Sequence, residues 1–290
     1  MLTATAPTTN GFPNVMPGMK LLGEVISWTC PGIAVRHADV VAALRDAGLD
    51  ESVARVLLPR HAFARACKKL AHDRIIRPVS EDAEAITFQF TQESRVGDKY
   101  EYTLETMLRL EKATGKVRCD LAGLATLAQD LLDRAIDHRT GSDVTRLIQR
   151  LFDRHADLFP VREAGGVYFV SQAHAAFVDR VQQFLNRVNG RLARFPVPAG
   201  TPHGDRSVKD AVADGLATLI AEHREAVAGF GEDTRRDTLD RAAERIRLTR
   251  HKLEAYSTYL ADARDRLADE LAVAARELLA RIDRLDGTAA

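Results

Sequence analysis

Residues 142–170 constrain the fold most strongly, because the hydrophobic period changes within this one continuous segment. Ser142 is a typical N-cap residue, and an apolar stripe with helical spacing follows it, formed by Val144, Leu147, Ile148, Leu151 and Phe152. Beyond Pro160, two short β-prone runs at 161–163 and 167–170 flank a Gly-Gly pair. The segment therefore predicts an amphipathic helix that leads directly into a β-hairpin.

The order of the preceding elements resembles that of winged-helix proteins. Helical patterns cover residues 36–47 and 50–57, and a third helix starts at Pro59, where proline suits the first helical position. Four β-prone runs follow, at 75–79, 86–91, 99–110 and 117–119. Three helices followed by strands would place an enlarged hairpin in the position of a wing. This resemblance concerns element order, which many unrelated functions share.

We therefore predict a predominantly helical α+β fold, with two winged-helix-like modules followed by a C-terminal helical hairpin that contains a long coiled-coil helix. Residues 191–206 contain three prolines and two glycines, which predicts a linker between the second module and the C-terminal helices. Ser207 with Asp210 forms a helix-capping signature directly after this linker. The predicted divisions are a disordered tail at 1–20, modules at 21–120 and 121–190, the linker at 191–206 and the helical hairpin at 207–286.

The C-terminal segment predicts self-association. No glycine or proline interrupts residues 233–285, so one helix on the order of 75–80 Å is expected. A seven-residue repeat runs along it and then shifts by four residues. The residues expected to form an interface with a second chain are Leu239, Ile246, Leu253, Tyr256, Leu260, Leu267, Leu271 and Leu278. In the alternative interpretation the chain covers this surface itself, and the helix is a strut.

The charge balance leaves nucleic-acid binding to local patches. Lysine plus arginine equals aspartate plus glutamate, at 41 each, so no global field attracts nucleic acid. Segment 60–77 and the helix at 142–156 carry local basic clusters. The candidate nucleic-acid-binding residues are Arg60, Arg65, Lys68, Lys69, Arg74, Arg77, Arg146, Arg150, Arg154 and Arg162, with Arg139 just before the helix. The alternative is a solvated surface on which nearby aspartates pair with the arginines.

Cysteine usage and the N-terminal sequence favour a cytoplasmic protein. Cys30, Cys67 and Cys119 are widely spaced and odd in number, which is typical of free thiols in a reducing compartment. The N-terminal residues lack the basic and apolar regions of a signal peptide, and no apolar run approaches the ~20 residues that span a bilayer. We therefore expect no membrane association.

No motif in the sequence predicts catalysis, a metal or a cofactor. The nine histidines are dispersed, and neither a nucleophile elbow nor a glycine-rich nucleotide fingerprint occurs. The leading hypothesis is a non-enzymatic, DNA-associated adaptor or architectural protein that binds phosphates non-specifically and forms a homo-oligomer. One alternative is an assembly scaffold whose winged-helix modules bind protein, and another is an enzyme whose catalytic residues are distant in sequence.

Overall fold

The computed structural model describes residues 19–71, 74–96, 98–231, 233–260 and 263–288. It is a mixed α and β structure that is predominantly helical, as predicted from the sequence. The chain forms two compact units, each assembled from separate segments. Unit 1 comprises the residues up to Trp28, 152–179 and 192 onward, and unit 2 comprises 29–151 and 180–191. Most of the predicted tail at 1–20 lies outside the described residues.

Unit 2 contains a four-stranded antiparallel sheet with helices on one face. Strands β3 (Arg74–Glu81), β4 (Ala85–Val96), β5 (Lys99–Glu111) and β6 (Val117–Arg118) are hydrogen-bonded in sequence order. Apolar residues of the sheet, among them Phe90, form a core with helices α2 (Pro59–Lys69) and α3 (Ala122–Asp137). Because β6 is followed by α3 within one core, the predicted module boundary at residue 120 falls inside unit 2.

The remaining elements of unit 2 surround a second, two-stranded sheet. Strand β2 (Ala34–Arg36) pairs antiparallel with β7 (His138–Thr140), and each leads directly into a helix. These helices are α1 (His37–Asp46) and α4 (Gly141–His155), of which α4 continues into unit 1. The helix predicted at 50–57 is wrong, because only a short 3-10 helix at Glu51–Val53 forms before α2. The Asp50 carboxylate accepts a hydrogen bond from Ser52 N at the start of this turn.

Unit 1 is built on a second four-stranded sheet, in the order β10-β1-β9-β8. Its strands are β1 (Leu21–Thr29), β8 (Phe159–Pro160), β9 (Tyr168–Ser171) and β10 (Arg191–Pro198). A hairpin is present with Phe159 opposite Phe169, but its first strand is Phe159–Pro160 and not the predicted run at 161–163. However, β9 also pairs with β1, so the hairpin belongs to a larger sheet, and the winged-helix interpretation is not confirmed.

Long-range contacts hold the segments of this sheet together. Trp28 of β1 stacks on Tyr168 and Phe152 within unit 1. The expected linker at 191–206 instead contributes strand β10, where the buried guanidinium of Arg194 forms two hydrogen bonds with the carboxylate of Glu24 on β1. Both features depend on residues that are more than a hundred positions apart, which local composition does not reveal.

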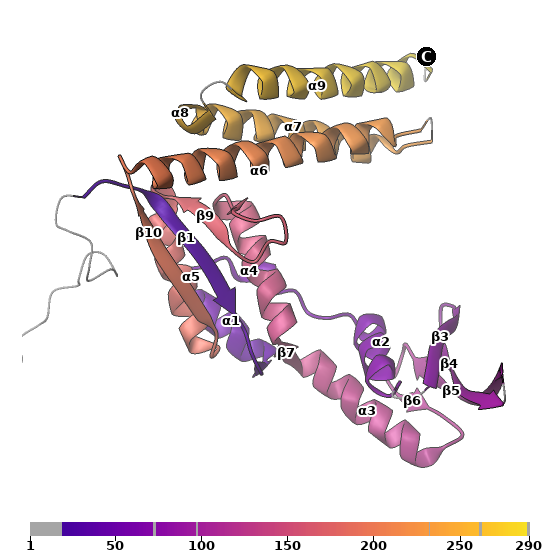
Figure 1. Ribbon diagram of the computed structural model, residues 1–290. Helices are drawn as coiled ribbons and strands as arrows, with labels where there is room; N and C mark the ends of the chain where they lie inside the picture. Colours follow the sequence, from indigo (N-terminus) through magenta and orange to yellow (C-terminus); the bar gives the residue numbers. More distant parts are fainter. Residues whose placement is uncertain (1–18, 72–73, 97, 232, 261–262, 289–290) are drawn as a thin grey trace, which may run out of the picture. The chain divides into compact units, whose positions relative to one another are not determined.

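The C-terminal helices form a compact bundle rather than one long helix (Figure 1). Its main helices are α6 (Pro202–Ala228), α7 (Arg236–Ala255) and α9 (Ala263–Thr288), each packed on the other two. Helix α6 begins at Pro202, so Ser207 lies inside it and is not its N-cap. The short helix α8 (Ser257–Leu260) lies between α7 and α9, and α5 (Ala175–Arg187), preceded by a 3-10 turn at Gln172–His174, completes the helices.

The predicted long coiled-coil helix is therefore wrong, and a tertiary contact explains why. Tyr256 ends α7 without a glycine or proline, and its hydroxyl donates a hydrogen bond to the Asp157 carboxylate at 3.0 Å. Its ring packs edge-on against Phe159. All eight residues proposed for self-association are at most 4% exposed, and they lie in one core with α6. This burial removes the free apolar surface on which the oligomer prediction was based.

Leu260→Lys tests this bundle. A lysine at a site that is 3% exposed should destabilise unit 1 by several kcal/mol, because its charge would be buried without a partner. We expect a lower denaturation midpoint and loss of helical circular dichroism. A variant that keeps its fold and changes only from oligomer to monomer would contradict this expectation and restore the coiled-coil interface.

Two helical glycines provide a matched test of packing. A Cβ added at Gly215 in α6 would lie 2.8 Å from a ring carbon of the buried Phe159, whereas one at Gly123 in α3 would meet no atom within 4 Å. Gly123→Ala should stabilise the protein by up to about 1 kcal/mol through helix propensity. Gly215→Ala should destabilise it, because the ring must move. Urea denaturation of both variants measures the difference, and a stabilised Gly215→Ala would contradict the close approach.

Candidate functional site

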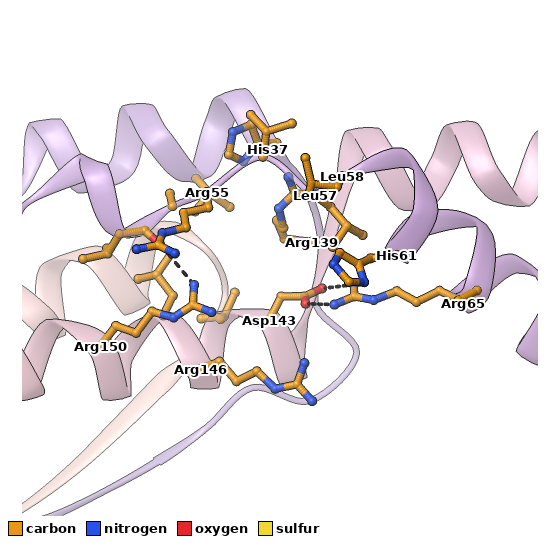
Figure 2. A pocket seen from close by; sticks show the side chains of 17 residues that line it. His37, Arg55, Leu57, Leu58, His61, Arg65, Arg139, Asp143, Arg146 and Arg150 are labelled. Atoms are coloured by element: carbon orange, nitrogen blue, oxygen red, sulfur yellow. Dashed lines mark hydrogen bonds and ion pairs between the residues drawn. The ribbon is translucent and has the colours of Figure 1, made fainter. Parts of the chain in front are cut away.

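A cavity of about 640 Å³ lies within unit 2. Its walls come from α1, α2, β7 and α4 and from residues 53–58, which connect the 3-10 helix to α2. Figure 2 shows that the labelled side chains approach the cavity from several sides. This volume is in the range of sites that enclose a small ligand, which is about 300–1,000 Å³.

Positive charge dominates the polar lining of this cavity. Five arginines, Arg55, Arg65, Arg139, Arg146 and Arg150, line it together with His37 and His61. Asp143 is the one carboxylate among the lining residues of the described structure. A cavity lining of this composition favours a ligand with several negative charges.

The negative charge of Asp143 is already balanced by neighbouring side chains. Both of its carboxylate oxygens accept hydrogen bonds from the guanidinium of Arg65, at 2.9 and 2.6 Å. The backbone N–H and the hydroxyl of Thr140 donate to the same carboxylate, at 3.0 and 2.9 Å. Burial alone would raise the pKa of Asp143, but these hydrogen bonds lower it to about 2. The carboxylate therefore stays ionised, and its charge is balanced by Arg65.

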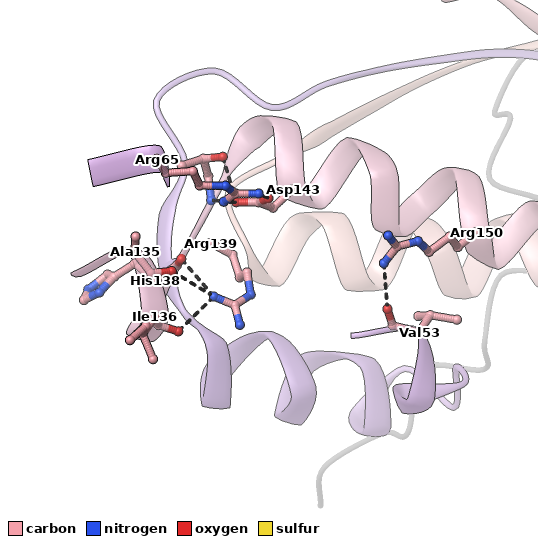
Figure 3. A network of polar contacts seen from close by, with 9 residues as sticks. Val53, Arg65, Ala135, Ile136, His138, Arg139, Asp143 and Arg150 are labelled. Atoms are coloured by element: carbon pink, nitrogen blue, oxygen red, sulfur yellow. Dashed lines mark hydrogen bonds and ion pairs between the residues drawn. The ribbon is translucent and has the colours of Figure 1, made fainter. Parts of the chain in front are cut away.

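Arg139 lies at the inner side of the cavity and is only 7% exposed. Its Nη1 donates to the carbonyl oxygens of Ile136 and His138 near the C-terminal end of α3, both at 3.0 Å (Figure 3). Its Nη2 is buried and has no hydrogen-bond partner among the described residues. Burial lowers the pKa of Arg139, the charge of Asp143 partly opposes this effect, and the charge of Arg65 lowers the pKa further. A guanidinium in a protein nevertheless remains protonated.

His37 contributes a second buried nitrogen without a partner, because its Nδ1 receives no hydrogen bond and donates none in the described structure. Burial lowers the pKa of His37, and the nearby charge of Arg139 lowers it further. The imidazole is therefore neutral at neutral pH, and it can donate from one ring nitrogen while it accepts at the other.

Arg55, Arg146 and Arg150 are exposed at the outer part of the cavity. Arg150 makes one long hydrogen bond, from Nη1 to the carbonyl oxygen of Val53 at 3.4 Å. Within the described residues, none of these three arginines forms an ion pair with a carboxylate, in contrast to Arg65. Their charges are available to a ligand.

The other part of the lining is apolar. Val40, Val53, Leu57, Val144 and Leu147 contribute to it, and two further residues, Val56 and Leu58, are 64% and 55% exposed. The lining residues include no serine, threonine, cysteine, tyrosine or lysine. A cavity with arginines, histidines and aliphatic side chains is suited to binding an amphipathic anion.

The structure brings together only part of the predicted nucleic-acid-binding set. Arg65, Arg146 and Arg150 line the cavity. Arg60 lines a second cavity of about 430 Å³ next to it, and the two cavities share His61 and Ala64 of α2. The predicted residues that remain exposed on nearby elements of unit 2 are Lys68, Lys69 and Arg77.

The other predicted residues are not part of the site. Arg74 forms two hydrogen bonds with the carboxylate of Glu105 on β5, so its charge is compensated. Arg154 and Arg162 belong to unit 1, and Arg162 donates from Nε to the carbonyl oxygen of Gly165 in its own loop. They were grouped with the other arginines because helix spacing alone does not show where a helix passes from one unit into another.

Sequence reasoning missed Arg55 and His37 as site residues, and it mentioned Arg139 only as a basic residue near a helix. Each of the three lies on an element whose local pattern indicates nothing unusual. A weak signal for Arg55 is its position in the apolar run Val53–Leu58, where an isolated charge interrupts the aliphatic side chains. The convergence of these residues depends on the pairing of β2 with β7.

The described residues contain no cluster of three or more histidine, cysteine or acidic side chains that could hold a metal ion. All three cysteines are free, and burial raises the pKa of Cys67 to about 12, which makes this thiol unreactive. Within the described part of the chain, no helix is both long and apolar enough to cross a bilayer.

Comparison with known families identifies the family of this chain. It belongs to DUF6744, a family of unknown function, which matches residues 21–286. No curated protein and no solved structure matches the chain. The match includes every residue that lines the cavity, so the cavity lies within the family domain.

Asp143→Asn tests the electrostatics of the cavity. Because the folded-state pKa of Asp143 is about 2, below the value of about 3.9 in an unfolded chain, ionised Asp143 contributes about 2 kcal/mol at neutral pH. This contribution is lost as the pH falls from about 4 to about 2. The variant should be less stable at neutral pH and should lose less stability over this acid range.

Urea denaturation at several pH values measures both effects. The exposed Asp120 provides the control, since Asp120→Asn should leave the acid dependence of the wild type unchanged. If Asp143→Asn and wild type lost equal stability between about pH 4 and about pH 2, the role assigned to this carboxylate would be wrong.

Proposed function

We propose that this protein binds nucleic acid through unit 2, as a binding protein rather than an enzyme. The observation that carries the proposal is the convergence of five guanidinium groups on one cavity whose single carboxylate is already paired. Arginine suits phosphate because its planar group donates two parallel hydrogen bonds. Self-association is not part of the proposal, because the residues expected to mediate it are buried in their own chain.

The basic surface extends beyond the cavity, which favours a polymer over a small isolated anion. Arg60 and His61 line the neighbouring cavity, so α2 contributes cationic or polar side chains to both. Lys68 and Lys69 follow at the C-terminal end of the same helix and are exposed. Successive phosphates of a nucleic-acid backbone could contact such a row, and each contact would release counterions.

The outer face of the β3–β6 sheet favours a single strand over a duplex. The core-facing positions of β5, such as Leu108, are buried, whereas Tyr100, Tyr102 and Leu104 near the β4–β5 turn are 52–59% exposed. Glu93 and Arg95 of β4 lie opposite the two tyrosines in the sheet register. Arg95 forms an ion pair with Asp98 at 3.8 Å. Exposed aromatic rings are stacking platforms for unpaired bases, so the two tyrosines carry this part of the proposal.

A binding series with single-stranded and duplex oligonucleotides tests the proposal. Wild-type protein should bind the single strand more tightly at ~50 mM salt, and the affinity should fall as salt increases. Arg146→Ala should weaken binding to all sequences. It should also reduce the salt slope by about 0.7 for each phosphate contact that is lost from a single strand. Fluorescence anisotropy gives both quantities.

Arg134→Ala is the matched control, because Arg134 is an exposed arginine on helix α3 of the same unit and does not line the cavity. It should leave the affinity and the salt slope nearly unchanged. Absence of binding to either oligonucleotide at ~50 mM salt would exclude nucleic-acid binding, since electrostatic association is strongest at low salt. Equal losses in both variants would remove the cavity from the binding surface.

A further inference from the structure

The cavity in unit 2 is more enclosed than a contact with a continuous backbone requires. Its walls come from three separate stretches of chain, and Arg139 at its inner side is only 7% exposed. A phosphodiester in the middle of a strand has a nucleoside on each side, so it reaches exposed arginines more easily than a buried one. The end of a strand, or a single nucleotide, can insert into a cavity of about 640 Å³.

The buried guanidinium of Arg139 forms no ion pair in the described structure, although the charges of Asp143 and Asp137 act on it from a greater distance. Its Nη1 is occupied by main-chain carbonyl oxygens, its Nη2 has no partner, and no ion pair joins it to a carboxylate within the described residues. A buried cation of this kind is unfavourable by itself, so the site gains stability when an anion approaches. The unpartnered Nδ1 of His37 is a second polar atom in the same lining.

The excess charge favours a phosphate monoester over a diester. Arg65 is balanced by Asp143, which leaves the charges of Arg55, Arg139, Arg146 and Arg150 without a carboxylate partner in the described structure. A phosphodiester carries a single negative charge and two free oxygens. A monoester carries about −1.5 to −2 at neutral pH and three oxygens that accept hydrogen bonds, so it satisfies more of these donors.

The apolar lining is suited to the rest of a nucleotide. Val56 and Leu58 are more than half exposed. Val56 directly follows Arg55 in the chain, and Leu58 lies three residues after it. An aliphatic surface beside a phosphate site can cover a ribose or the face of a base. Inorganic phosphate would leave this surface uncovered, and it should therefore bind more weakly than a nucleotide.

We propose that this cavity binds the terminal phosphate monoester of a nucleotide, either at the phosphorylated end of a single strand or in a free nucleoside monophosphate. The assignment to nucleotides rests on the proposed function. The buried guanidinium of Arg139 contacts the phosphate, the exposed arginines Arg55 and Arg146 hold its outer oxygens, and the aliphatic residues contact the sugar or base.

The test compares one single-stranded oligonucleotide with a 5′-phosphate, with a 3′-phosphate and with hydroxyls at both ends, by fluorescence anisotropy on the full-length chain. One phosphorylated form should bind roughly tenfold more tightly than the hydroxyl form, which corresponds to one additional charge-assisted hydrogen bond. Competition by adenosine monophosphate and by inorganic phosphate distinguishes a free nucleotide from a strand end as the ligand.

Variants connect this preference to the cavity. Arg139→Met should reduce the ratio of the two affinities towards one, provided that circular dichroism shows an intact fold, since Arg139 also contacts the end of α3. Arg55→Ala, at an exposed position, should lower the same ratio without a risk to folding. Arg134→Ala, outside the cavity, should leave the ratio unchanged.

The outcomes separate the two proposals. Equal affinity for all three oligonucleotides would overturn the terminal-phosphate site and leave nucleic-acid binding intact. Binding of adenosine monophosphate without binding of any oligonucleotide would overturn nucleic-acid binding and support the site with a free nucleotide as its ligand. If neither oligonucleotide nor nucleotide bound, both proposals would be wrong.

Discussion

The ion pair between Arg65 and Asp143 is the interaction on which the cavity of unit 2 depends. It joins α2 to the first turn of α4 across 78 positions of sequence, and Thr140 fixes the same carboxylate from the preceding strand. Since Asp143 is the one carboxylate in the described lining, the pair also decides the charge of the cavity. The carboxylate of Asp143 balances the charge of Arg65, and the other four arginines of the lining keep their positive charge for a ligand.

The positive charge of the cavity therefore results from where its arginines lie and not from an excess of basic residues in the chain. Acidic and basic residues are equal in number, and many of the described arginines outside the cavity form ion pairs, such as Arg194 with Glu24 and Arg187 with Asp46. The cavity differs because its walls are aliphatic where other surfaces carry carboxylates. Aliphatic neighbours also strengthen electrostatic interactions by excluding water, which suits the capture of a phosphate.

Unit 1 buries the heptad residues of its C-terminal helices within its own core. The leucines of α7 and α9 pack with α6 and with Phe159 and Phe169 from the sheet. The break at Tyr256 makes this packing possible, because the chain reverses where a single helix would have left a long apolar seam exposed. The proposed ligand site accordingly lies in unit 2 and needs no second copy of the chain.

The sequence by itself determined the elements that depend on local patterns. Amphipathic periodicity predicted α1, α4 and most of α6, while Pro59 marked the start of α2 and β-prone runs marked β3–β6. Local patterns also identified Arg65, Arg146 and Arg150, since basic residues cluster on those helices.

Only the tertiary structure decided which elements meet: β1 pairs with β9, β2 pairs with β7, and Tyr256 contacts Asp157. These contacts join residues between about 99 and about 150 positions apart, and their free energy comes from shared burial that no local window contains. Because long-range burial is not visible in a local window, the sequence around Arg139 predicts an ordinary surface arginine. Only the fold makes Arg139 a buried cation beside a cavity.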